Sequence, residues 1–181
     1  MKEKTLSAVL AFWFDELEPK HWFVKDSRVD EAIRARFGAL YEAMSASGSN
    51  HSEQSLETLA RIIVLDQFPR NMFRETKQAF STDELALQIA GSGIAVGQDK
   101  GLLPSQQAFF YMPYMHSEEA QDQARSVALF AAPGLEGNYD FAIKHKAIID
   151  RFGRYPHRNA VLGRKSTEEE LHFMQKPGSA F

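Results

Sequence analysis

Apolar residues recur along the chain at helical spacing, three or four positions apart, and almost nowhere in the alternation typical of a half-buried strand. The pattern predicts about eight helices. Their ranges are 6–17, 27–44, 56–68, 81–96, 105–112, 117–131, 138–152 and 167–175. We therefore expect an all-α fold, with residues 1–181 forming a single all-helical domain.

Local signals place the starts of several of these helices. Ser27 with Asp30, and Ser81 with Glu84, have the spacing of a capping box, in which two side chains satisfy amides at a helix start. Ser117 is followed by two glutamates, and acidic residues favour a helix N-terminus. We expect helices to begin at these three serines.

Three prolines divide the chain at a nearly constant interval. Pro69, Pro113 and Pro156 each follow an aromatic residue or methionine, and they lie 44 and 43 residues apart. Each is predicted to close a helix, and the first and third lead into Arg-Asn. A period of this length, with two helices per unit, predicts stacked antiparallel helical hairpins of tetratricopeptide-like type. The alternative is that proline follows helices often, without any repeat.

Two features concern how closely the helices pack. Gly91 and Gly93 should each weaken the helix 81–96 by about 1 kcal/mol relative to alanine. One face of the helix 117–131 carries small residues that would allow close helix approach. They are Ala120, Ala124, Ala128 and Ala131.

Composition narrows the class of protein. The 181 residues are 44% apolar and 12% aromatic, which indicates a folded core rather than a disordered chain. The net charge of −3, with acids and bases interspersed, argues against a nucleic-acid partner. The chain has no cysteine, which excludes disulfides, thiolate metal sites and cysteine nucleophiles. The first residues predict an amphipathic helix rather than a signal peptide, and no stretch suits a membrane span, so we expect a cytoplasmic protein.

Polar residues interrupt two of the apolar helix faces. His145 falls in the apolar cluster of helix 138–152, whose members are Phe141, Ala142, Ile148, Ile149 and Phe152. It is either a buried histidine bonded to a backbone carbonyl or an imidazole that contacts ligand and transfers protons. Asp66 lies at the edge of the apolar stripe of helix 56–68, beside Gln67. Because buried carboxylates are rarely unpaired, Asp66 should pair with Arg70, Arg154 or Arg158, and a structural ion pair is the favoured reading.

A third segment of the chain is expected to lie near these residues. His116 stands directly before helix 117–131, and Glu118 and Arg125 share one stripe of it. If the hairpins stack in register, this corner approaches the same groove as the two Pro-Arg-Asn turns. The alternative is a helix-start carboxylate and an exposed arginine.

Arginines are concentrated after the predicted helix ends. Such residues complement the negative end of a helix dipole, but the four at 70, 154, 158 and 164 exceed that need. Guanidinium groups bind carboxylate or phosphate bidentately, so they form a plausible anion receptor. The ligand-binding candidates are Arg70, Asn71, His116, Arg125, His145, Arg154, His157, Arg158 and Asn159. The catalytic candidates are His145, His157, Asp66 and Glu118.

No common catalytic motif supports a particular reaction. The sequence has no Gly-rich phosphate loop, no HExxH and no GxSxG. The histidine spacings match no standard metal site, so we predict neither a metal nor a cofactor.

Several long motifs carry a family resemblance. They read DQFPRNMFR from Asp66, YMPYMHSE from Tyr111, RSVALF from Arg125 and RFGRYPHRN from Arg151. Together they resemble a bacterial family catalogued as domain of unknown function 924, and the likeness extends over nearly the whole chain. The resemblance implies an all-helical fold similar to the tetratricopeptide-like superfamily. It implies no reaction, substrate or catalytic residue.

Three hypotheses on function remain open. The first is a helical-repeat protein whose Arg/His-lined groove binds an anionic small molecule or an acidic peptide. The second is a hydrolase of a phosphorylated or carboxylated metabolite, with a histidine as acid or base and a carboxylate orienting it. The third is a structural or protein-interaction module in which every arginine is satisfied internally. The sequence does not specify the oligomeric state.

Overall fold

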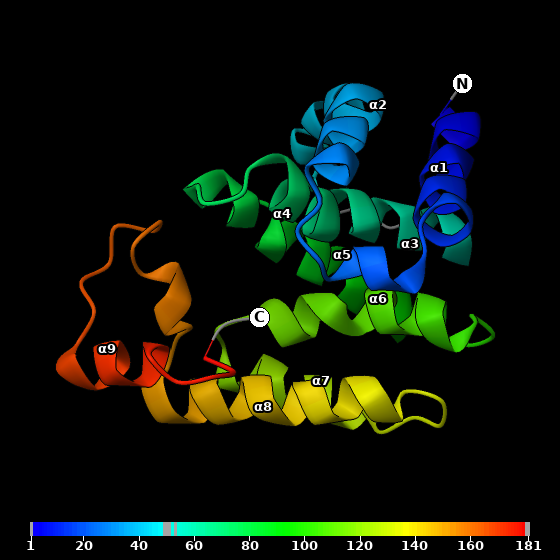
Figure 1. Ribbon diagram of the computed structural model, residues 1–181. Helices are drawn as coiled ribbons and strands as arrows, with labels where there is room; N and C mark the ends of the chain where they lie inside the picture. Colours follow the sequence, from blue (N-terminus) through cyan, green and yellow to red (C-terminus); the bar gives the residue numbers. More distant parts are fainter. Residues whose placement is uncertain (1, 49–51, 53, 180–181) are drawn as a thin grey trace.

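The computed structural model describes residues 2–48, 52 and 54–179, and every regular element in these ranges is helical (Figure 1). The α-helices are α1 (Lys2–Leu10), α2 (Ser27–Ser45), α3 (Ser55–Ile62), α4 (Phe68–Met72), α5 (Asp83–Ala95), α6 (Pro104–His116), α7 (Ala120–Phe130), α8 (Glu136–Phe152) and α9 (Glu168–Met174). Two π-helical segments, Ala11–Glu16 and Ile63–Gln67, continue α1 and α3. Short 3₁₀ turns form at Pro19–Trp22, Lys77–Phe80 and Pro156–Arg158. The predicted all-α fold is confirmed.

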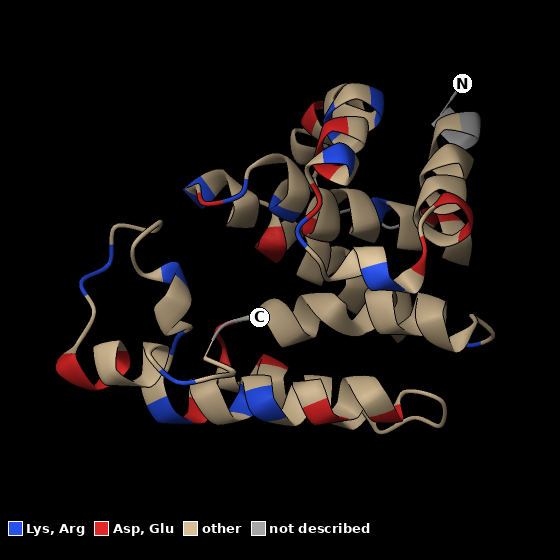
Figure 2. Ribbon diagram, in the orientation of Figure 1, with Lys and Arg blue, Asp and Glu red and all other residues tan. Residues whose placement is uncertain are grey.

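Helix α6 lies between the two halves of the molecule. It contacts α3 and α5 on one side and α7 and α8 on the other (Figure 1). It carries no Lys, Arg, Asp or Glu along its length (Figure 2). Phe109, Phe110 and Met112 of α6 are buried in the main core, so apolar burial on both sides explains its central position.

A second, smaller apolar cluster lies at the C-terminal end. Ile148, Ile149 and Tyr155 are buried there, and Phe152 and Phe173 pack against them. This cluster joins the end of α8 to α9, and α9 contacts the turn Pro156–Arg158. It therefore fixes the position of that turn relative to α8.

Pro69 does not end a helix as predicted. The chain passes from α3 through the π-helical segment into α4, with Pro69 in the first turn of α4. A proline has no amide to bond the carbonyl four residues earlier, which here belongs to Leu65. The hydroxyl of Thr82 donates to that carbonyl instead, at 2.5 Å. This substitute bond from a distant residue allows the helix to continue.

Pro113 also lies inside a helix, because α6 extends to His116. Of the three prolines, only Pro156 follows a helix end, where α8 stops at Gly153 in the left-handed conformation (φ 67°). The proline interval therefore does not mark three helix ends. The stacked tetratricopeptide-like hairpins stay a prediction.

The predicted capping boxes are wrong as well. Asp26, not Ser27, caps α2 by accepting from the amide of Arg28 at 2.9 Å, and Asp30 instead bonds Arg74. The stronger acceptor one residue earlier displaces the serine. Ser81 donates its hydroxyl to a carbonyl in the preceding turn, and α5 begins only after Thr82.

The start and the packing face of α7 also differ from expectation. The helix begins at Ala120 rather than Ser117, whose hydroxyl donates to Asp122. The predicted close-packing alanine face is exposed, and the buried face carries Gln123, Ser126 and Phe130. Similarly, Phe141 of α8 is 49% exposed rather than part of the buried cluster. Among the described residues, no helix is long and apolar enough to cross a membrane.

Candidate functional site

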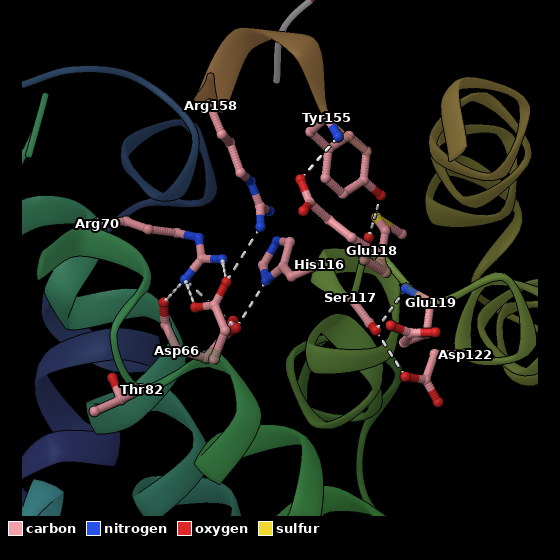
Figure 3. Close-up of polar contacts among 12 residues, drawn as sticks. Asp66, Arg70, Thr82, His116, Ser117, Glu118, Glu119, Asp122, Tyr155 and Arg158 are labelled. Atoms are coloured by element: carbon pink, nitrogen blue, oxygen red, sulfur yellow. Dashed lines mark hydrogen bonds and ion pairs between the residues drawn. The ribbon is translucent and has the colours of Figure 1, made fainter. Parts of the chain in front are cut away.

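Polar and charged side chains from five separate elements meet at the C-terminal end of α6 (Figure 3). The π-helical segment, the starts of α4 and α5, the last residue of α6 and the turn Pro156–Arg158 each contribute at least one. We name these five residues the polar cluster: Asp66, Arg70, Asp83, His116 and Arg158. Three of them, Asp66, His116 and Arg158, lie in or beside the segments where the sequence predicted a site. Those segments are the two Pro-Arg-Asn turns and the corner before helix 117–131.

A carboxylate–histidine pair forms the centre of the polar cluster. Asp66 is fully buried, and the Nδ1 of His116 lies 2.7 Å from its Oδ1. Gln67 donates to the other carboxylate oxygen at 2.5 Å. An ionised carboxylate only accepts hydrogen bonds, so Nδ1 of His116 carries the hydrogen and Nε2 has a free lone pair. No described residue bonds that Nε2, and it is not sealed from solvent.

The surroundings favour an ionised Asp66 and a neutral His116. Burial alone would raise the pKa of Asp66, but the electrostatic interaction with His116, then the charge of Arg70, and the hydrogen bonds from His116 and Gln67 hold that pKa below its ordinary value. Burial, and then the positive charge of Arg70, lower the pKa of His116. At neutral pH the imidazole is therefore an uncharged base whose tautomer is fixed by Asp66.

Arg70 is satisfied by internal partners. Its Nη1 and Nη2 donate to the two oxygens of Asp83 at 2.8 and 2.9 Å, a bidentate pair. Nη1 also donates to the backbone carbonyl of Asp66. Arg70 thus joins the starts of α4 and α5 and holds a positive charge next to the carboxylate–histidine pair.

Arg158 is buried but poorly matched. Its side chain is 8% exposed, and the one hydrogen bond it makes to a described residue is a long contact of 3.4 Å from Nη1 to Asp83. The Nε is buried without a partner. The guanidinium lies 4.6 Å from the ring centres of both Phe80 and Tyr155. Burial, and then the charge of Arg70, lower the pKa of Arg158, as expected for a cation without its own anion.

Comparisons with known proteins assign the family. Residues 9–178 match the family described as "Bacterial protein of unknown function (DUF924)". The chain belongs to this family. It is also similar to a solved structure titled "Structure of Protein of Unknown Function ATU0120 from Agrobacterium tumefaciens", with 32% sequence identity and a TM-score of 0.88. That similarity covers 97% of this chain and 99% of the other. Among curated proteins, none matches the chain.

Two predicted arginines of this DUF924 chain have internal carboxylates as partners. Arg154 binds Glu170 through two hydrogen bonds, at 2.7 and 2.9 Å. Arg164 binds Glu118 at 2.5 and 2.9 Å, and Glu118 also accepts from the amide of Tyr155 at 2.8 Å. These two ion pairs hold the segment after α8 in place, and neither includes a residue of the polar cluster.

Three further candidates lie away from the polar cluster. Asn71 donates to Asp30 at 2.9 Å, and Asn159 donates to Ser166 at 3.0 Å. Arg125 is exposed on α7 and makes no hydrogen bond or ion pair with the polar cluster in the described structure. Whether these residues contact a ligand stays a prediction without geometric support.

His145 has the arrangement of a structural histidine. It is 6% exposed, and its Nδ1 donates to the carbonyl of Phe141 in the preceding turn at 2.8 Å. Burial lowers the pKa of His145 to about 3, so the ring is neutral at pH 7. Its ring packs edge-on against Tyr155, with centroids 5.7 Å apart.

His157 faces a different region from the polar cluster. It borders an open groove of about 440 Å³, lined also by Arg164, Ser166 and Leu171. Burial, then the charge of Arg158, lower the pKa of His157 to about 4, and its Nδ1 is buried without a partner. No three His, Asp or Glu side chains in the described ranges are placed to hold a metal ion.

Sequence reasoning missed Asp83, Phe80 and Tyr155 as parts of the site. Asp83 reads as an ordinary first-turn acid of α5, and Phe80 ends a short 3₁₀ turn. Tyr155 is distinguished in the sequence only by its place before Pro156. Nothing in their local sequence separates them from structural residues, because their role comes from contacts with Arg70 and Arg158.

Proposed function

We propose that the polar cluster binds a small anionic molecule through Arg158. The observation that carries this proposal is the mismatch at Arg158, a cation with an 8% exposed side chain, an unpartnered Nε and one contact of 3.4 Å. A buried charge without a close partner is destabilising, and a ligand oxyanion would relieve that cost.

Two aromatic rings support anion binding at Arg158. Its guanidinium carbon lies 4.6 Å from the ring centres of both Phe80 and Tyr155, and these cation–π contacts help to hold the buried cation. Nη2 has no described partner and is not sealed from solvent, so it can donate to a carboxylate or phosphate oxygen. Nε is buried beside it, so a bidentate contact requires a neighbouring side chain to move.

The alternative, a structural module without a ligand, predicts different surroundings for Arg158. A module without a ligand would have each of these arginines paired closely with an internal carboxylate, as Arg70, Arg154 and Arg164 are. The Nε of Arg164 is also buried without a partner, so what distinguishes Arg158 is the lack of a close carboxylate. Arg158 departs from that pattern among the described residues. This contrast favours anion binding over a purely structural role.

Stability and binding measurements on Arg158→Met test the proposal. Methionine retains much of the apolar stem but removes the charge, so the unliganded variant should be as stable as the parent or more stable. Inorganic phosphate and succinate should raise the melting temperature of the parent, and their affinity should fall about 10- to 100-fold in the variant, the loss expected for charge-assisted hydrogen bonds. Arg158→Lys should also weaken binding, because lysine lacks the planar fork.

Two controls complete the experiment. Arg125→Met removes an exposed arginine and should leave affinity unchanged. Arg154→Met breaks the pair with Glu170 and should lower stability without changing affinity. Equal destabilisation by Arg158→Met and Arg154→Met, with no anion shifting the melting temperature of the parent, would support the structural module instead.

A further inference from the structure

We propose that this site is also an esterase or amidase centre: His116 activates a water that hydrolyses an acyl bond of a carboxylate-bearing molecule held by Arg158. The inference rests on the proposed anion binding. The sequence-based hypothesis named His145 or His157 as the acid or base. In the structure, Nδ1 of His116 is the imidazole nitrogen that bonds the carboxylate of Asp66.

The geometry at His116 is that of a general base with an orienting carboxylate. Asp66 accepts from Nδ1 at 2.7 Å and fixes the tautomer, so the lone pair is on Nε2. The side chain of His116 is 16% exposed, and Nε2 is neither bonded to a described residue nor sealed from solvent. Neither His145 nor His157 has a carboxylate on its Nδ1 among the described residues. His145 is oriented by a carbonyl of its own helix, and no described group bonds Nδ1 of His157.

The π-helical segment gives independent support. Asp66 lies in the segment Ile63–Gln67, where the amide of Phe68 bonds the carbonyl of Ile63, five residues back. Such wide turns are frequent at functional positions, since they reposition side chains at a cost in regular hydrogen bonding. Here the wide turn places a fully buried carboxylate beneath a histidine from another helix (Figure 3).

The charges of the polar cluster favour a carboxylate as the bound group. Asp66 and Asp83 are negative, Arg70 and Arg158 are positive and His116 is neutral at pH 7, so the cluster has no net charge. The unpaired Nη2 of Arg158 suits one oxyanion group of charge −1. A doubly charged phosphate would also meet the two aspartates.

The reaction balances with water as the only co-reactant. One O–H bond of the water breaks and its proton moves to Nε2 of His116, while the water oxygen bonds to the acyl carbon of the substrate. The bond from that carbon to the leaving oxygen or nitrogen then breaks, and its electron pair stays with the leaving group. His116 returns the proton to the leaving group, so the products are an acid and an alcohol or amine and the site is restored.

Two chromogenic esters test the inference on the full chain. The mono-p-nitrophenyl ester of succinic acid carries a free carboxylate, and p-nitrophenyl acetate does not. We expect the protein to hydrolyse the succinate ester with a kcat/KM at least tenfold above that for the acetate. His116→Gln retains a donor to Asp66 and should lower kcat about 10²- to 10⁴-fold, the usual contribution of a general base. Arg125→Gln should leave the rate unchanged.

Asp66 is a positioning residue in this scheme, and the pH profile tests it. In the parent, kcat/KM should be level from pH 7 to 8 after subtraction of the uncatalysed rate, which includes attack by the ester's own carboxylate, because the pKa of His116 lies below its ordinary value. Asp66→Asn should lower kcat. It should also change the pH at which kcat/KM rises to its level region, which a loss of packing alone would not do.

Failure of the inference can be told apart from failure of the binding proposal. If succinate raises the melting temperature through Arg158 but hydrolysis is absent or unchanged in a folded His116→Gln, the site binds anions without this catalysis. If hydrolysis occurs equally with both esters, the carboxylate assignment is overturned. If succinate does not bind and does not change the rate at which either ester is hydrolysed, both proposals are wrong.

Discussion

Acidification from pH 7.0 to pH 5.5 should destabilise the protein through its buried histidines. His145 and His157 have pKa values lowered to about 3 and about 4, mainly by burial, against an ordinary value of 6.5. Because the folded pKa lies below the unfolded one, the unfolded chain takes up protons that the folded chain does not. Their contribution to stability is therefore complete above pH 6.5 and decreases as the pH falls towards the folded values.

The size of the effect follows from these two histidines. Each should cost about 1.3 kcal/mol between pH 7.0 and 5.5, or roughly 2.5 kcal/mol together, at about 1.4 kcal/mol per proton per pH unit. His116 adds to this loss, because burial and Arg70 lower its pKa too. The paired carboxylates contribute little in this range, since Glu170, whose pKa the Arg154 hydrogen bond lowers to about 2, loses its stabilising charge only at more acidic pH.

Urea unfolding at pH 7.0, 6.0 and 5.5 measures this loss. The buried Trp13 and half-buried Trp22 report unfolding by fluorescence. His157→Gln should remove about 1.3 kcal/mol of the pH-dependent loss, and His172→Gln, which replaces an exposed histidine of α9, is the matched control. A free energy of unfolding that stays constant from pH 7.0 to 5.5 would refute the argument that these rings are buried in the neutral form.

Three substitutions test the packing. Gly93→Ala should destabilise the protein by about 1–3 kcal/mol despite alanine's better helix propensity, because its Cβ would lie 2.7 Å from the fully buried ring of Phe110. Gly137→Ala, at a helical position with nothing within 4 Å, should instead stabilise it by about 0.5–1 kcal/mol, and equal effects of the two changes in urea unfolding would contradict this account. Tyr155→Phe should cost about 1–2 kcal/mol, because its buried hydroxyl donates to the carbonyl of Met115 at 2.6 Å; an unchanged urea midpoint would show that this bond contributes nothing.

The helical class was predictable because apolar spacing is a local property, whereas several helix boundaries were not. Pro69 reads as a helix end in any sequence window, since its missing amide leaves a carbonyl unpaired. The group that satisfies that carbonyl is the hydroxyl of Thr82, 17 residues away. The glycines of α5 show the same limit. Gly93 lowers helix propensity, but it also allows Phe110 of α6 to approach.

The proximity of three segments was predictable from the sequence, but the pairing of their side chains was not. Asp66 on an apolar face, His116 before a predicted helix and Arg158 after Pro156 were all candidates, and the structure brings these segments together. The sequence did not indicate which histidine pairs with a carboxylate. His145 looked more conspicuous because it interrupts an apolar face, yet a carbonyl one turn away satisfies it. His116 at a helix end looked ordinary, and its carboxylate is 50 residues distant.

Arg158 differs from the neighbouring arginines in the partner it lacks. Each of the others has a carboxylate that it binds bidentately: Asp83 for Arg70, Glu170 for Arg154 and Glu118 for Arg164. The remaining buried carboxylate of the polar cluster, Asp66, accepts from His116 and is unavailable. In the described part of the chain, Arg158 therefore shares Asp83 at 3.4 Å with a better-placed competitor. A ligand carboxylate bound at Nη2 would supply that missing partner beside the lone pair of His116, so binding and base catalysis would depend on the same position.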